Sequence, residues 1–188
     1  MYKELLLERF MPYKSLGYKL LNDGTELFGN DKQIAPQAWL HQIFPPLNNN
    51  EISIIEDQLE QTLPNSLLDF YQQMNGFRIF VIQFSVSGLR KNFSSSIEST
   101  WQPTSIEIKN LHERPSKAKE EYIFIGFYSK NGNLVYVNAK NENVSVCTVD
   151  NADPIKTWRN LSEFFVEELE NIFSIHGSKY FPIDGGVH

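Results

Sequence analysis

Residues that could carry acid–base, nucleophilic or metal chemistry are few and lie far apart. The histidines are His41, His112, His176 and His188, and none is paired at metal-ligand spacing. Cys147 is the only cysteine, and it lies in an apolar, strand-like segment where burial keeps a thiol protonated and inaccessible. One cysteine cannot form a disulfide within the chain or a thiolate zinc site. We therefore expect neither a metal nor a cofactor.

Carboxylates occur in adjacent pairs, Glu56-Asp57 and Glu167-Glu168. Two carboxylates act as general acid and base only when they converge in a cleft. Adjacent residues on a helix point about 100° apart, so solvated helix surfaces are favoured over a catalytic dyad. The chain also has no phosphate-binding loop and no Gly-x-Ser-x-Gly motif. The sequence therefore favours a protein that is not an enzyme.

The charge of the chain is acidic and unevenly spread. There are 17 basic and 23 acidic residues, a net charge of −6, which argues against binding to nucleic-acid phosphates. Between residues 51 and 76 there are acids but no lysine or arginine. Within this segment the candidate partner-binding residues are Glu56, Asp57, Glu60 and Asp69. They suit a basic protein partner, although acidic helix surfaces are often simply solvated.

Length and composition indicate one ordinary domain with enough apolar material for a core. The chain has 188 residues, of which 41% are hydrophobic. No stretch approaches the roughly 20 apolar residues of a membrane helix, and the first residues do not resemble a secretory signal. We expect a cytoplasmic protein that contacts no membrane. The oligomeric state stays open.

The first stretch of the chain, Met1 to about Pro36, gives the weakest pattern. A short helix over Glu4–Met11 and several turn signals predict an extension over residues 1–36. From Ala35 to Phe44, the spacing of Trp39 and Ile43 predicts a short helix that begins the main domain.

Two amphipathic helices follow, and their pattern is much clearer. In Glu51–Thr62 and Asn65–Gly76, apolar residues recur at intervals of three and four, which is the spacing of one helix face. Pro64 separates the two helices. Gly76 suits the left-handed residue that often ends a helix.

The remainder of the chain predicts strands and a final helix. The expected strands are Arg78–Phe84, Ser105–Lys109, Tyr122–Tyr128, Leu134–Asn138 and Val144–Val149. A polar loop is expected from Gly88 to Pro103, and a helix capped by Asn160 ends the domain. This order predicts an α+β fold in which helices pack on one side of an antiparallel meander. The expected domain spans residues 37–175, with a tail over 176–188.

The residues from Glu51 to Gly76, together with the later strands, resemble the SUKH superfamily, named after the yeast Smi/Knr cell-wall regulator. The family-like positions, beside Glu56, are Trp39, Leu59, Leu63, Pro64, Phe70, Tyr71, Asn75, Gly76, Gly126, Trp158 and Phe165. The resemblance covers about Trp39 to Phe173. Each of these positions has a structural explanation, so the resemblance supports the fold more than the function.

The resemblance implies a protein that acts by binding. Bacterial members of the superfamily are mostly immunity proteins that neutralise toxins, often nucleases, and eukaryotic members are regulatory scaffolds. Two functions therefore stay open. The acidic segment suits an immunity protein that covers a basic toxin domain. The serine-rich loop and the N-terminal extension suit a regulatory module of the Smi/Knr type that has no toxin partner.

Overall fold

An antiparallel sheet organises the whole chain. The computed structural model describes residues 1–94 and 100–180, so most of the expected tail lies outside the described residues. The described strands pair in sequence order, β1 to β9, and every pair is antiparallel. They are β1 (Tyr18–Leu20), β2 (Glu26–Asn30), β3 (Trp39–Ile43), β4 (Phe77–Ile79), β5 (Phe84–Val86), β6 (Tyr122–Tyr128), β7 (Leu134–Asn138), β8 (Val144–Cys147) and β9 (Pro154–Trp158).

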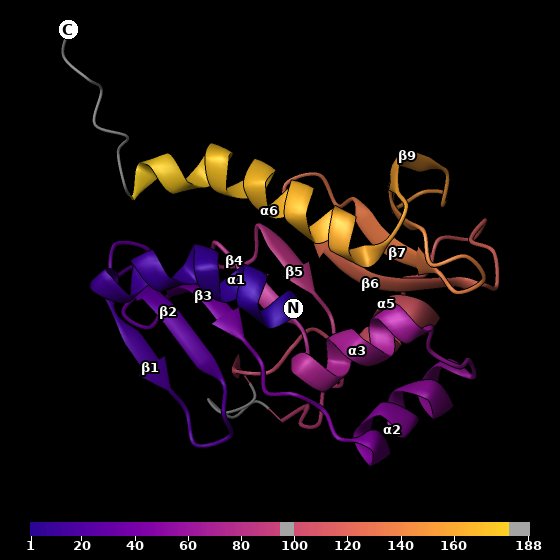
Figure 1. Ribbon diagram of the computed structural model, residues 1–188, viewed down its shortest axis with the longest axis horizontal. Helices are drawn as coiled ribbons and strands as arrows, with labels where there is room; N and C mark the ends of the chain where they lie inside the picture. Colours follow the sequence, from indigo (N-terminus) through magenta and orange to yellow (C-terminus); the bar gives the residue numbers. More distant parts are fainter. Residues whose placement is uncertain (95–99, 181–188) are drawn as a thin grey trace, which may run out of the picture.

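Helices form the second layer, and the α+β meander fold is thereby confirmed. They are α1 (Tyr2–Phe10), α2 (Asn49–Leu59), α3 (Asn65–Gln73), α5 (Ile106–Leu111) and α6 (Leu161–His176). Short 3-10 turns follow α1 at Met11–Leu16 and α6 at Gly177–Lys179. In Figure 1, α6 runs along the sheet, α1 lies beside it, and α3 and α2 lie beyond α1.

The main core lies between the helices and one face of the sheet. Tyr2 of α1 makes edge-to-face contacts with Phe70 of α3 and Phe165 of α6, at centroid distances of 5.9 and 5.8 Å. The N-terminal helix is therefore packed in the same core as the later helices. A smaller apolar cluster, which includes Phe124 and Tyr136, covers the opposite face of β6 and β7.

The structure confirms the two amphipathic helices and shows how they are capped. Asn48 and Glu51 form a capping box at the start of α2. The start of α3 follows Pro64, which has no capping side chain. Instead, the Ser66 backbone N–H donates to Oε2 of Glu142 at 3.0 Å, although Glu142 belongs to the distant β7–β8 turn. Glu142 has a positive φ of 59°, an unfavourable conformation that this contact helps to hold.

The predicted helix over Ala35–Phe44 is wrong, because the second half of this segment is strand β3. Residues at i and i+4 share a face of a helix, but they also share a face of a strand, so the spacing of Trp39 and Ile43 fitted both. Pairing decides the outcome, since β3 lies between β2 and β4, with Ile43 opposite Phe77.

Two further predictions around the sheet are also wrong. The single strand expected over Arg78–Phe84 is a hairpin, because the chain turns at Phe80 and Val81, which have φ values of 47° and 70°. The strand expected over Ser105–Lys109 lies mostly in helix α5, whose first turn is capped when Ser105 Oγ accepts from the Ile108 N–H at 3.3 Å. Strand β9 was not predicted, since its residues up to Trp158 are exposed.

Gly76 has the predicted positive φ, 91°, but for a different reason. Helix α3 ends at Gln73, so Gly76 lies beyond its cap in the approach to β4. A Cβ on Gly76 would lie 2.4 Å from the carbonyl oxygen of Val86. The glycine is therefore required by close backbone packing as well as by its conformation.

Alanine substitutions at Gly76 and Gly132 separate these two requirements. Gly132 also has a positive φ, 71°, but a Cβ there would meet nothing within 4 Å. We expect Gly132→Ala to lower the free energy of unfolding by about 1–2 kcal/mol. Gly76→Ala should cost about 1–3 kcal/mol more, because the backbone must also shift. Equal losses in urea denaturation would contradict the close-packing explanation.

His41 lies in an aromatic cluster at the heart of the core. Its ring stacks on Phe10 at 4.4 Å and meets Tyr13 and Phe80 edge-on, at 4.3 and 4.7 Å. Nδ1 accepts a long hydrogen bond of 3.4 Å from the Phe80 N–H, and Nε2 has no partner among the described residues. Burial lowers the pKa of His41 to about 3. The imidazole therefore stays neutral in the folded protein.

Because the pKa of His41 is lower in the folded protein than in the unfolded chain, the free energy of unfolding should fall as the pH is lowered. Well above pH 6.5 neither state protonates His41, but as the pH falls through 6.5 the unfolded chain binds a proton that the folded chain does not. Between pH 7.5 and 5, wild type should lose about 2 kcal/mol more stability than His41→Phe. The exposed His112 supplies a control, and His112→Gln should follow wild type. Parallel curves for wild type and His41→Phe in urea titrations would rule out this effect.

Candidate partner-binding surface

Most of the candidate acids lie at the end of α2, but they differ in burial and in hydrogen bonding. Glu56 is half-buried, and its Oε1 accepts the Leu63 backbone N–H at 2.9 Å. This hydrogen bond closes the turn between α2 and α3. Glu56 therefore has a structural contact that accounts for its position.

Asp57 and Glu60 are exposed, and neither carboxylate makes a hydrogen bond or ion pair within the residues that the structure describes. The last turn of α2 contains no basic residue. The negative end of a helix dipole disfavours carboxylates by about 0.3–1 kcal/mol each. Glu60 also caps the helix with a left-handed φ of 50°, where glycine is preferred. The two acids thus stand where they reduce stability.

Asp69 lies on α3, away from this turn. Its Oδ1 accepts from Nε2 of Gln73 at 3.0 Å, and Oε1 of Gln73 accepts from the amino group of Met1 at 3.0 Å. Burial raises the pKa of Tyr2, and the charge of Asp69 contributes to this increase. Asp69 therefore belongs to the contact between α3 and α1, and the structure separates it from Asp57 and Glu60.

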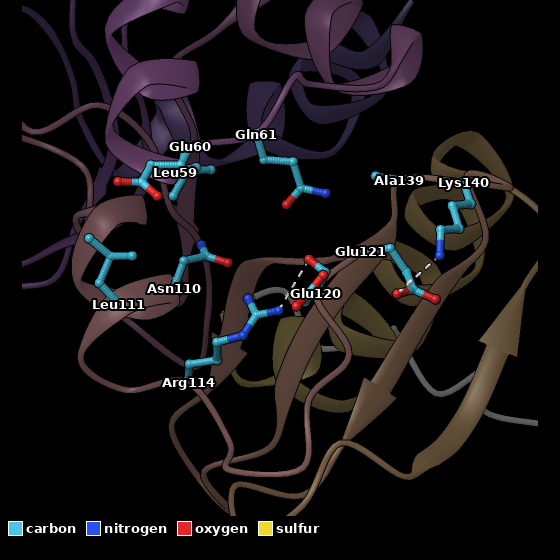
Figure 2. Close-up of a pocket in the computed structure, with 10 residues that line it drawn as sticks. All are labelled: Leu59, Glu60, Gln61, Asn110, Leu111, Arg114, Glu120, Glu121, Ala139 and Lys140. Carbon is cyan, nitrogen blue, oxygen red and sulfur yellow. Dashed lines mark hydrogen bonds and ion pairs between the residues drawn. The ribbon is translucent and has the colours of Figure 1, made fainter.

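A groove opens beside the end of α2, and we name it the α2–α5 groove (Figure 2). Its volume is about 590 Å³. It is bounded by the end of α2, the end of α5, the segment before β6 and the turn after β7. Its lining residues are Leu59, Glu60, Gln61, Asn110, Leu111, Arg114, Glu120, Glu121, Ala139 and Lys140.

Hydrogen bonds to backbone hold two walls of the groove in place. The Asn110 side chain accepts the Phe124 N–H and donates to the Phe124 carbonyl, both at 2.8 Å, so it pairs with β6 as a strand would. Arg114 donates to the Tyr122 carbonyl at 2.8 Å and to the Lys119 carbonyl at 2.5 Å. Burial lowers the pKa of Arg114, and Glu120 opposes this shift. The groove is therefore preformed.

The family-like positions lie in the core, beside it or at close backbone contacts, and of them only Leu59 lines the groove. Tyr71 donates its hydroxyl to the Ser87 carbonyl at 3.0 Å, and the Trp158 indole donates to Glu167 at 2.7 Å. A Cβ on Gly126 would lie 2.6 Å from the Ser85 carbonyl oxygen. Trp39 and Leu59 are half-buried, Pro64 precedes α3, and Leu63, Phe70, Asn75, Gly76 and Phe165 are buried.

Sequence reasoning missed most of the groove. Arg114, Glu120 and Lys140 lie in segments between predicted elements, and nothing in their spacing indicates that they meet. Arg114 follows α5, which was predicted as a strand, and donates to the Glu120 carbonyl at 3.3 Å. Lys140 enters from the turn after β7, where it pairs with Glu121. The described ranges contain no cluster of three or more histidine, cysteine or acidic residues that could hold a metal. No helix in the same ranges is long and apolar enough to cross a membrane.

Comparison with known proteins gives two similarities. The model of the SMI1 / KNR4 family (SUKH-1) matches residues 46–167, which include the whole α2–α5 groove. Helix α1 and strands β1–β3 precede the match. YnaB of Bacillus subtilis (strain 168), whose name describes it only as an uncharacterized protein, is 26% identical over 142 residues. The alignment covers 74% of this chain and 85% of that protein.

The position of Asp57 predicts a stabilising substitution. We expect Asp57→Lys to raise the free energy of unfolding by about 0.5–1 kcal/mol, because a cation suits the C-terminal end of α2. Asp150→Lys is the control, since it makes the same charge change at an exposed site outside any helix. The comparison uses urea denaturation at low salt. An Asp57→Lys variant no more stable than Asp150→Lys would show that the acid carries no such cost.

Proposed function

The chain belongs to the SMI1 / KNR4 family (SUKH-1), and from this premise we propose that it is an immunity protein that neutralises a toxin by binding it directly. In this proposal the partner is a basic toxin domain, with nucleases as the leading class, and the binding takes place in the cytoplasm. The protein itself is not an enzyme.

One observation carries the proposal: the exposed carboxylates of Asp57 and Glu60 have no partner among the described residues, and they lie at a helix end where negative charge is unfavourable. Lysine or glycine there would stabilise the fold. Residues that lower stability and make no stabilising contact are typical of functional surfaces. Partner binding is a direct reason for acids at this place.

Charge supports the choice of a basic partner. The net charge is −6, and nuclease active sites are basic because they hold phosphates. Opposite charges steer the encounter of two proteins and increase the association rate. Salt screens exposed charges over about 8 Å at physiological strength, so the steering should weaken as salt is added.

The environments of the reactive side chains agree with a binding role. Burial raises the pKa of Cys147 to about 11, so the thiol is a poor nucleophile. The adjacent acids diverge, since Glu167 bonds Trp158 while Glu168 accepts the Tyr128 hydroxyl at 2.6 Å. These contacts give each group a structural role.

The alternative is a regulatory or scaffolding module of the Smi/Knr type without a toxin partner. The observation that favours it is the N-terminal part of the chain. Helix α1 and strands β1–β3 lie outside the family match, yet they extend the same sheet and core. They add surface, including the exposed edge strand β1, to which further proteins could bind.

The binding test uses the partner recovered by co-purification from the native cells. Its association with wild type is compared by surface plasmon resonance with an Asp57→Lys/Glu60→Lys variant. A Glu8→Lys/Asp150→Lys variant changes the net charge equally at exposed sites elsewhere. We expect the first variant to lower the on-rate about tenfold at low salt, and less at high salt, because steering is lost. Equal on-rates for the two variants would contradict a role for these acids.

A growth assay separates the two functions. The partner is expressed alone and together with wild type. An immunity protein requires that the partner alone arrests growth and that co-expression restores it. A partner that is harmless by itself would contradict the immunity proposal and support the regulatory module.

A further inference from the structure

We propose that the α2–α5 groove binds an arginine or lysine side chain, next to an apolar residue, on a basic segment of the partner protein. This inference rests on the proposed function, because it specifies which chemistry of the partner the acidic surface recognises. The proposed binding surface then includes the α2–α5 groove as well as the exposed acids beside it.

The net charge of the groove lining is negative, because it holds Glu60, Glu120 and Glu121 against Arg114 and Lys140. Its two cations are already committed inside the protein. Arg114 donates to backbone carbonyls, and the ammonium of Lys140 lies 3.5 Å from Oε2 of Glu121. The carboxylates of Glu60 and Glu120 make no hydrogen bond or ion pair with any described residue. Hydrogen bonds to neutral carbonyls leave Arg114 charged, and this charge is attracted to Glu120. A cation that enters the groove therefore meets the Glu60 carboxylate, which has no ion-pair partner among the described residues, in a lining where acids outnumber bases.

The remaining walls suit the aliphatic part of a basic side chain. Leu111 of α5 is 53% exposed, and Leu59 and Ala139 are half-buried beside the groove. Lysine and arginine carry a long apolar stem that packs on such residues while the charged end reaches carboxylates. The side-chain amide of Gln61 also points into the groove (Figure 2). Its oxygen can accept a hydrogen bond from the cation.

The size and rigidity of the groove fit a segment of protein. Its volume of about 590 Å³ is larger than one side chain, so neighbouring residues of the partner can enter as well. Asn110 is fixed to Phe124 and Arg114 to Tyr122, so binding requires little rearrangement of these walls. The exposed acid Asp57, on the adjoining turn of α2, extends the negative surface toward solvent.

The test uses two short synthetic peptides that differ only in the charged end of one side chain. One places arginine between two leucines, and the other replaces this arginine with neutral citrulline of nearly the same shape. Each is titrated into the full protein while backbone amide NMR signals are recorded. We expect the arginine peptide to shift the signals of Leu59, Gln61, Leu111 and Ala139, with an affinity at least about tenfold above that of the citrulline peptide.

The matched variants change the same number of charges at different places. Glu60→Gln/Glu120→Gln should weaken binding of the arginine peptide at least about tenfold, because both carboxylates are lost. Glu8→Gln/Glu170→Gln, at exposed positions elsewhere, should leave it unchanged. All four positions are exposed, so both variants should fold. Equal binding of the two peptides, shifts at other residues, or no shift at millimolar peptide would overturn the inference.

The peptide experiment and the growth assay can contradict the groove proposal and the immunity proposal independently of each other. A protein that neutralises its toxin but does not bind the arginine peptide keeps the function and loses the groove as its basis. A protein that binds the peptide in the groove but rescues no toxin-expressing cell keeps the groove and loses the immunity role.

Discussion

Three parts of the chain meet where Asn75 and Gly76 approach the end of β5. The Asn75 side chain accepts the Leu89 N–H at 2.7 Å and donates to the Leu89 carbonyl at 2.8 Å, as a neighbouring strand would. Gly76 accepts the Phe44 N–H at 3.2 Å. A Cβ on Gly88 would lie 2.2 Å from Oδ1 of Asn75, so no larger residue fits without a shift. This contact joins β3, α3 and β5, and Gly88 then pairs with Ser105 ahead of α5.

The binding surface depends on this junction because the junction positions the helices around it. With α3 fixed to the sheet, α2 packs on α3 and on α5, and the groove forms between the ends of α2 and α5.

Unfavourable left-handed backbone conformations persist elsewhere in the structure where a tertiary contact holds them. Glu142 caps α3 from a left-handed turn, and the buried ring of Phe80 anchors another such turn. Glu60 has the same conformation, but its side chain makes no such contact with any residue that the structure describes.

The sequence predicted the elements whose own residues determine them. Helices α2, α3 and α6 and strands β6 to β8 show apolar periodicity and local caps or turns, as at Asn48 and Asn160. Prediction from the sequence failed for elements whose conformation is determined by pairing with distant segments. Strand β3 exists because β2 and β4 flank it, and the β4–β5 turn contains no glycine. The candidate acids were chosen for their charge, although Glu56 also matches a family-like position. The structure was needed to show that Glu56 bonds Leu63, whereas the Asp57 carboxylate has no partner among the described residues.

Hydrogen exchange of the protein, measured by mass spectrometry with and without its bound partner, tests the central claim most directly. The claim is that the end of α2 and the α2–α5 groove form the interface. Binding should slow exchange in residues 57–63, 110–121 and 138–141, because partner contact shields these segments and stabilises their hydrogen bonds. Exchange in the edge strands β1 and β9 should not change. Protection confined to β1 or β9, with no effect beside the groove, would contradict the claim.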